Sequence, residues 1–399
     1  MRRLWRSIQQ ITSPKTPYRN ISDLRPFQPG DRVLLRPKSS RNVSATLTLP
    51  LKPGLRLDTH KGSITHDDIL GKRVRDIVCT GPTKSAPEGT DFRLYEVRLE
   101  EYVRFTRRLV TPLYPQDARL IVDLLDLHVQ APQWGHESAG PKIEILEAGT
   151  GHGALTLYLS RAIHGGNRPL PLKCSDVEDE EDHVALGQWK STRRAVIHTI
   201  EVSPRYSTHA QKIVKGFRKG MYHHNVDFHV ANVSEWTRAT LERRGGEAFL
   251  SHAFLDLPST EEHLSAVTAA LRVDGALIVF CPSITQIMAC MEKVKTDAIP
   301  LDLERVLELG VNGGTGGREW DVRAVRPRAA VKANEAAREV VRDGEDSGVE
   351  VSDDDELPVE GAEKARQGDK GGFKMVCRPK VGEMVVGGGF LGVFRKQRM

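Results

Sequence analysis

The chain has 399 residues, a length that suits about two domains. Hydrophobic residues make up 39% of the chain and charged residues 28%, as in a soluble globular protein, and no apolar run approaches the ~20 residues of a membrane span. The five cysteines are odd in number and show no CxxC spacing, so neither a disulfide scaffold nor a metal site is expected. The net charge of +5 is small but unevenly distributed.

Residues 1–26 form a basic arm. This stretch is rich in arginine and in hydroxyl side chains, and it contains no acid before Asp23. Such a composition is typical of a mitochondrial presequence, whereas a basic arm that contacts RNA is the alternative interpretation. We therefore expect a protein of the mitochondrial matrix, with a nuclear location as the alternative.

Residues 27–110 are expected to form a small antiparallel β domain. Short β-like runs at 32–36, 46–48 and 94–98 are separated by glycine and proline. Residues 1–58 carry 12 Lys or Arg against three acids. This surplus would suit contact with phosphates, although solvated surface charge explains it equally well.

From Thr111 onward, expected strands and helices alternate. Ser203 and Pro204 give the clearest helix start, as N-cap and first helical residue. The alternation predicts an α/β fold with a doubly wound, mainly parallel sheet. The expected strands are 142–146, 195–200, 226–230, 253–257 and 276–281, and the expected helices are 117–127, 154–163, 204–218 and 263–271.

Two acidic stretches interrupt this domain, which we assign to residues 111–399. They cover about 165–192 and about 333–371, and both contain few large apolar residues. Such segments cannot bury enough apolar surface to offset the entropy of ordering, so we expect solvated inserts without regular structure.

A glycine turn lies between the first strand of this domain and the helix after it. Its sequence runs from Glu147 through Gly149, Gly151 and His152 to Gly153. Glycines let the chain turn sharply and let a ligand approach the backbone. The turn also satisfies G-x-G-x-x-A, so a nucleotide-dependent dehydrogenase stays an alternative.

The positions of three acids distinguish a site for S-adenosylmethionine from a site for a dinucleotide. Glu147 ends the first strand, and Glu201 ends the second one about 50 residues later, instead of the ~20 expected for a dinucleotide site. Asp256 follows a later strand, at the sheet edge where open α/β folds bind ligands. This arrangement favours S-adenosylmethionine, with Glu201 accepting from the ribose hydroxyls and the Glu147 region facing the sulfonium.

Several motifs occur along the chain in a fixed order. They are Lys61–Gly71, Glu100–Val103, Arg107–Arg108, Thr111–Asp117, Glu147–Thr156, Ile200–Glu201, Phe254–Pro258, Ser283–Ile287, Arg318–Val322 and Phe390–Phe394. Together they resemble the catalytic subunits of tRNA (adenine-58-N1)-methyltransferases, over residues 27–330 and 372–396. Ser259–His263 replaces the Pro-Trp pair of the nuclear type, and the segments 100–117 and 283–287 look closer to the mitochondrial paralogue.

The resemblance implies a seven-stranded class I methyltransferase fold, Rossmann-like, preceded by the small β domain. It implies S-adenosyl-L-methionine as cofactor, tRNA as partner, and methylation of N1 of adenine 58 in the T-loop. It also suggests a homotetramer, or a heterotetramer with a related non-catalytic subunit, and no membrane association. A catalytically inactive RNA-binding subunit is the alternative, because the Pro-Trp pair is missing.

Carried over position by position, the resemblance assigns the catalytic role to Asp256. One departure concerns Asn232, where the family usually has Asp, so we expect weakened cofactor affinity. Packing roles stay open for His152 and Tyr206. The residues implied to contact the cofactor are Leu113, Glu147, Gly149, Gly151, His152, Gly153, Ala154, Glu201, Tyr206, Asn232, Val233 and Asp256.

Overall fold

The structure, a computed structural model, describes residues 25–38, 45–84, 86–132, 140–170, 180–310, 320–325, 374–379 and 388–398. It divides into a large unit, residues 1–309 with 387–399, and a second unit, residues 310–386. In the second unit, β13 (Trp320–Val325) pairs antiparallel with β14 (Lys374–Pro379). Among the described helices, none is both long and apolar enough for a bilayer crossing.

The large unit begins with the expected antiparallel β domain. Four strands pair in the order β2-β1-β6-β5, and a separate hairpin joins β3 and β4. Leu35, Phe92 and Leu94 are among the residues of its own apolar core. Its elements are β1 (Val33–Pro37), β2 (Thr46–Leu47), β3 (Arg56–Thr59), β4 (Gly62–Thr65), α1 (His66–Ile69), β5 (Ile77–Cys79) and β6 (Asp91–Glu96).

A seven-stranded sheet follows, in the order β12-β15-β11-β10-β7-β8-β9. The strands from β11 to β9 run parallel, and β15 pairs antiparallel with β11 and β12. The expected mainly parallel sheet of a class I methyltransferase fold is thereby confirmed. The strands are β7 (Ile143–Ala148), β8 (Ala195–Glu201), β9 (Val226–Val230), β10 (Leu250–Leu255), β11 (Leu271–Cys281), β12 (Leu301–Leu309) and β15 (Gly389–Lys396).

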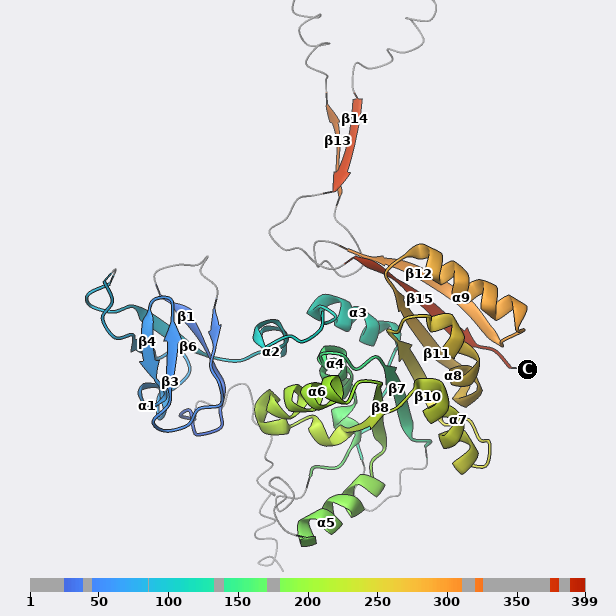
Figure 1. Ribbon diagram of the computed structural model, residues 1–399, viewed down its shortest axis with the longest axis horizontal. Coiled ribbons are helices and arrows are strands. Elements are labelled where there is room, and N and C mark those ends of the chain that lie inside the picture. The colour runs from blue at the N-terminus through green and yellow to red at the C-terminus, as the bar shows by residue number, and fades with distance from the viewer. Residues whose placement is uncertain are drawn as a thin grey trace, which may run out of the picture. The chain divides into compact units, whose positions relative to one another are not determined.

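Alternate residues of the sheet enter two different cores. Ile145 belongs to the core under α3, α4 and α6, whereas the next residue, Leu146, belongs to the core under α7, α8 and α9. Because successive side chains of a strand point to opposite faces, this division builds a sheet covered on both sides. Figure 1 shows the two groups of helices on either side of the central strands. The helices are α2 (Leu99–Phe105), α3 (Pro115–Leu124), α4 (Ala154–Ile163), α6 (Pro204–Gly216), α7 (Val233–Arg243), α8 (Leu264–Ala270) and α9 (Ile284–Thr296).

Short 3-10 helices join several of these elements. They cover His164–Gly166, Phe217–Gly220, His223–Asn225 and Thr260–His263.

Two segments differ from the sequence-based expectation. The first acidic stretch contains a helix, α5 (Glu180–Ser191), whose Trp189 is buried and donates its indole N–H to the carbonyl of Arg168 at 3.1 Å. The expectation of an irregular insert is therefore wrong for its second half, because one aromatic side chain anchors it. Strand β12 was not expected at all. The second acidic stretch, 333–371, lies outside the described residues.

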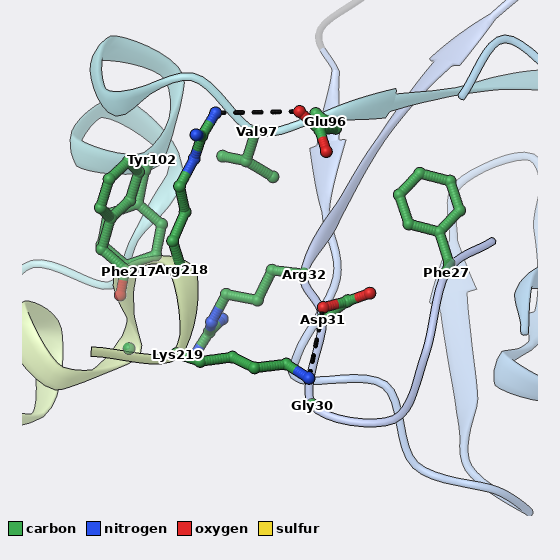
Figure 2. A pocket seen from close by; sticks show the side chains of 11 residues that line it. Phe27, Gly30, Asp31, Arg32, Glu96, Val97, Tyr102, Phe217, Arg218 and Lys219 are labelled. Atoms are coloured by element: carbon green, nitrogen blue, oxygen red, sulfur yellow. Dashed lines mark ion pairs between the residues drawn. The ribbon is translucent and has the colours of Figure 1, made fainter. Parts of the chain in front are cut away.

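The β domain meets the methyltransferase domain where α2 crosses the end of α6. The Tyr102 hydroxyl donates to the carbonyl of Ile213 at 2.8 Å, and its ring lies edge-on to Phe217 with 5.2 Å between centroids. Figure 2 shows these two rings side by side, on the wall of a small pocket that Asp31 and Arg32 also line. This contact fixes α2 against α6.

Two cations beside this pocket adopt an unusual backbone conformation. Arg218 and Lys219 both lie in the left-handed region, with φ of 45° and 56°. Arg218 pairs with Glu96 at 3.8 Å and Lys219 with Asp31 at 3.7 Å, so both side chains point at the β domain (Figure 2). The pair costs about 1–2 kcal/mol per residue in backbone strain, which the contacts across the junction must offset.

Candidate active site

The glycine turn lies at the carboxyl end of β7, against the carboxyl end of β10. Gly149 has a φ of 90°, and a Cβ added there would lie 2.2 Å from the carbonyl oxygen of Asp256. No side chain fits at that distance, so glycine is required. Gly153, with a φ of 80°, is the N-cap of α4 and offers no side chain to its first N–H groups. Those donors therefore face the turn.

Glu201 holds the turn in place from the end of β8. Its carboxylate accepts the N–H of Gly151 at 3.1 Å through Oε2 and the N–H of Ser203 at 3.1 Å through Oε1. The side chain is buried. A carboxylate has about four acceptor positions, so two stay available for a ligand with paired hydroxyl groups.

Two further carboxylates lie at the same edge. Glu147 is 1% exposed and accepts the hydroxyl of Thr156 at 2.6 Å. Burial raises the pKa of Glu147 to about 7, against the lowering effect of the Thr156 and Thr199 hydroxyls. Burial, together with the negative charge of Glu201, raises the pKa of Asp256 to about 6.

No cation of the described ranges forms an ion pair with any of these three carboxylates. Those ranges also hold no group of His, Cys, Asp or Glu arranged for a metal ion. A buried carboxylate without a counter-ion is unfavourable and gains by taking a proton or a positive ligand. The edge is therefore suited to a cationic organic ligand.

Two exposed apolar side chains, which the sequence analysis did not single out, flank Glu201. Val202 follows it directly and is 64% exposed, and Val230, at the end of the neighbouring β9, is 52% exposed. Large apolar groups in this position are suited to cover a planar ring. The sequence signal was an apolar residue directly after the acid of the second strand.

Asn232 and Val233 begin helix α7. The Asn232 Oδ1 accepts the N–H of Ser234 at 2.9 Å and of Glu235 at 3.3 Å, so it caps the helix. Both lone pairs of this oxygen are engaged, and the amide N–H₂ is the group left for a ligand. Val233 is buried in the apolar core, so only its backbone can reach a ligand.

His152 points its ring away from the turn, toward the linker after α2. Its Nε2 lies 3.2 Å from the Thr106 hydroxyl, and its Nδ1 has no hydrogen-bond partner among the described residues. Burial, with the nearby His209 and Arg108, lowers the pKa of His152 to about 4, so the ring is neutral. Its side chain thus fixes the linker, and its backbone is the part that faces the site.

The remaining predicted residues lie around this edge. Ala154 is buried as the first residue of α4, and Tyr206 is half-buried in the first turn of α6. Leu113 is half-buried against the core under α4. The structure therefore brings the glycine turn, Glu147, Glu201 and Asp256 together, and the cofactor contacts of all the residues named in the sequence analysis stay predictions.

Comparisons with known proteins agree with this geometry. Residues 26–73 match the family model described as TrmI-like N-terminal. The chain is 30% identical over 291 residues to the tRNA (adenine(58)-N(1))-methyltransferase TrmI of the bacterium Thermus thermophilus, which covers 73% of this chain and 88% of that protein. The protein of the same name from a second strain of this bacterium is equally similar.

Two solved structures share the fold. A SAM-dependent O-methyltransferase from Thermotoga maritima superposes with a TM-score of 0.55 at 17% identity, covering 94% of this chain and 95% of that one. The tRNA (m1A58) methyltransferase TrmI from Aquifex aeolicus gives a TM-score of 0.50 at 17% identity, covering 94% of this chain and 100% of that one.

Proposed function

The chain belongs to the TrmI family of tRNA (adenine(58)-N(1))-methyltransferases, and we propose that it transfers a methyl group from S-adenosylmethionine to N1 of adenine 58 in tRNA. The observation that carries the proposal is a group of three carboxylates at one sheet edge, the buried Glu147 and Glu201 and the half-buried Asp256, without a cation among the described residues. A sulfonium ligand supplies the positive charge that this edge lacks.

The residues at this edge fit the cofactor. Glu201 has acceptor positions left for the ribose hydroxyls. Val202 offers an exposed apolar surface to the adenine, and Asn232 offers its amide N–H₂ to an acceptor of that ring. At the start of α4, the N–H of Thr156 is engaged by Glu147, and the N–H groups of Ala154 and Leu155 suit the amino-acid carboxylate.

S-Adenosylmethionine supplies an electrophilic methyl group. Adenine N1 carries an in-plane lone pair, so the chain needs no base to create a nucleophile. The N1–carbon bond forms as the carbon–sulfur bond breaks, and the positive charge passes to the base. The main task of the protein is to align the two reactants, which is proximity catalysis.

Asp256 is the residue that we place beside the reacting base. It lies at the carboxyl edge, against the Gly149 backbone. Its carboxylate can accept from the N6 amine and stabilise the positive charge that develops on the base. Because adenine 58 is shielded in folded tRNA, the base must leave its stack to reach this carboxylate.

Each of the two alternative functions requires a different site from the one found in this chain. An inactive RNA-binding subunit does not need the glycine turn together with Glu201 and Asp256, all of which this chain retains. A nucleotide-dependent dehydrogenase would bind an anionic pyrophosphate, which the three carboxylates oppose.

The direct test is methylation of unmodified tRNA. The protein is incubated with S-adenosylmethionine and tRNA, and 1-methyladenosine is located by mass spectrometry. We expect one methyl group at position 58, and none in a tRNA whose adenine 58 is replaced by guanine. Methyl transfer elsewhere, or none with a folded protein that binds S-adenosylmethionine, would contradict the proposal.

We also propose that the protein acts in mitochondria, as the composition of residues 1–26 supports. A fusion of residues 1–30 to a reporter should enter mitochondria, and a cytosolic or nuclear reporter would reject this location. A homotetramer is the proposed assembly, with a heterotetramer as the alternative. The mass of the purified protein by light scattering tests it, because a stable monomer would contradict the homotetramer.

A further inference from the structure

Two segments of the large unit contain no acidic residue. The first runs from Tyr102 to Gln116, and the second from Val202 to Val226. The first contains three arginines, and the second contains five Lys or Arg and three histidines.

The two segments pack against each other. The Tyr102 hydroxyl bonds the Ile213 carbonyl at 2.8 Å, and the ring N–H of His209 bonds the Arg107 carbonyl at 3.0 Å. Basic residues that lie far apart in the sequence therefore share one part of the surface.

Helix α6 presents its cations on one side. Its buried residues are Ser207, Ala210, Ile213 and Val214, whereas Arg205, Lys212 and Lys215 are exposed. Positions seven residues apart lie on the same face of a helix, two turns from each other, and Lys215 follows Lys212 at the next turn. The exposed Arg104, Arg107 and Arg108 of the first segment extend this surface.

These six cations differ from their two neighbours in the second segment. Arg218 and Lys219 point at the β domain, where Glu96 and Asp31 pair with them (Figure 2). Across the ranges that the structure describes, no ion pair involves any of the six, which are Arg104, Arg107, Arg108, Arg205, Lys212 and Lys215. Like charges gathered without acids repel one another, so ion pairing within the fold does not account for these six cations.

The same surface borders the glycine turn. Thr106 contacts His152 at 3.2 Å, and a Cβ on Gly151 would lie 3.4 Å from Val110. On the α6 side, a Cβ on Gly153 would lie 3.3 Å from Ala210. The two segments that carry these cations therefore pack against the glycine turn through their buried residues.

We propose that Arg104, Arg107, Arg108, Arg205, Lys212 and Lys215 form an RNA-binding surface for the tRNA phosphates that flank the extruded adenosine. This inference rests on the proposed function and adds the residues that position the substrate. Phosphate contacts fix the register of a nucleic acid on a protein without reading its sequence. Here the register would place one nucleotide at the active site.

Salt-dependent tRNA binding tests the surface. Two double variants of the full chain, Arg107→Gln with Arg108→Gln and Arg205→Gln with Lys212→Gln, remove charge from each segment. The matched control is Arg238→Gln with Lys295→Gln, which removes two exposed cations from α7 and α9. We expect each surface variant to lower the slope of log affinity against log salt by about 1.4–1.8, at roughly 0.7–0.9 per phosphate contact. The control should keep the wild-type slope.

The outcomes separate this inference from the proposed function. If wild-type protein methylates adenine 58 but the surface variants keep wild-type affinity and slope, the surface is wrong and the function stands. An equal loss in the control would also reject the surface, because any two cations would then serve. If the variants weaken tRNA binding but the wild type never methylates adenine 58, the surface stands and the function is wrong. Binding of S-adenosylmethionine by every variant confirms that each is folded.

Discussion

Glu144 and Glu147 lie three residues apart on strand β7, one near each end of the sheet, and both are buried. At the amino end, the Glu144 carboxylate accepts from His198 at 2.9 Å and from both terminal nitrogens of Arg244 at 2.8 Å. Burial alone would raise the pKa of Glu144, but these hydrogen bonds outweigh it and hold the pKa at about 2.

The neighbouring strands repeat this contrast. At the amino end, Asp227 of β9 pairs with Arg193 at 2.6 Å, and its pKa is lowered because this hydrogen bond outweighs the effect of burial. At the carboxyl end, Glu147 and Asp256 have no such partner among the described residues, and burial raises the pKa of both. One sheet thus carries neutralised acids at one end and acids that lack a cation at the other.

The difference teaches how structural and functional charges can be told apart. A buried acid that supports the fold has its counter-ion within the chain, because an unpaired charge would be costly. A buried acid kept for a cationic ligand has none, and its raised pKa records the missing charge. Substitutions and pH changes at both ends of the sheet test this distinction.

The largest effect is expected at Asp256. Asp256→Ala should slow single-turnover methyl transfer by about 10²–10³, the range for losing one preorganised electrostatic contact. Asp256→Asn should recover part of this loss, because its carbonyl still accepts from the N6 amine. Saturating tRNA and cofactor keep binding defects out of the measurement. A wild-type rate in Asp256→Ala would remove Asp256 from the mechanism.

Glu201 should matter for binding more than for chemistry. We expect Glu201→Ala to weaken S-adenosylmethionine binding by about 1.5–3 kcal/mol, the range for hydrogen bonds to a charged group. Calorimetry measures the affinity, and circular dichroism checks the fold, since Glu201 also accepts the N–H of Gly151. Unchanged affinity in a folded variant would contradict the ribose assignment.

Glu144 should behave in the opposite way. Glu144→Gln leaves Arg244 and His198 without their counter-ion, so the free energy of unfolding should fall by about 2 kcal/mol. The methyl-transfer rate of the folded variant should equal that of the wild type. Urea unfolding and single-turnover assays at the same temperature check both statements, and a loss of rate without a loss of stability would overturn the comparison.

The pH dependence of cofactor binding follows from Glu147. Its pKa of about 7 in the free protein means that the proton leaves when a sulfonium binds. Affinity for S-adenosylmethionine should therefore rise about tenfold from pH 6 to pH 8, as linkage requires for one released proton. S-Adenosylhomocysteine lacks the sulfonium and should show a much smaller change. Equal pH profiles for the two ligands would reject the carboxylates as the sulfonium site.

The two glutamates also predict opposite effects of pH on stability. The pKa of Glu147 rises from its ordinary 4.5 to about 7, so its contribution to stability is present below 4.5 and is lost as pH rises through 7. The pKa of Glu144 falls from 4.5 to about 2, so its contribution is present above 4.5 and is lost as pH falls through 2. Measuring the unfolding free energy of Glu147→Gln and of Glu144→Gln across this pH range separates the two contributions.

The smallest effect is expected at Asn232. Asn232→Asp keeps the oxygen that caps α7 and replaces the amide N–H₂ with a second acceptor and a negative charge near the helix start. Helix stability should increase by about 0.3–1 kcal/mol. Affinity for S-adenosylmethionine should increase severalfold, as the adenine N6 amine gains an acceptor. Calorimetry measures this affinity, and a lower affinity for S-adenosylmethionine in the variant would contradict the assignment of Asn232.

The sequence predicted the elements whose local signals agree with their tertiary surroundings. Ser203 and Pro204 mark the start of α6 because a hydroxyl cap and a missing N–H are both local properties, and the structure has the helix there. The acids at the ends of β7 and β8 were located because the carboxyl ends of parallel strands share one edge.

The rest depends on contacts that no local pattern contains. Strand β12 carries Asp302, Glu304, Arg305 and Glu308, and its register shifts between Leu303 and Arg305, so alternation is lost. Its pairing with β15, which lies some 90 residues further along the chain, defines it as a strand. Likewise, the sequence analysis placed Asn232 at the cofactor but did not show that its side-chain oxygen caps α7.

The left-handed pair Arg218 and Lys219 has a consequence for the evolution of this chain. Glu96 and Asp31 of the β domain form ion pairs with the turn, so the contact between the two domains offsets the backbone strain of these two residues. A gene that lost its first 98 codons would keep the whole sheet and active site, yet it would encode a turn free to relax and a Tyr102–Phe217 contact open to water. The small domain therefore cannot be shed or exchanged alone, and its sequence must change together with that of the turn.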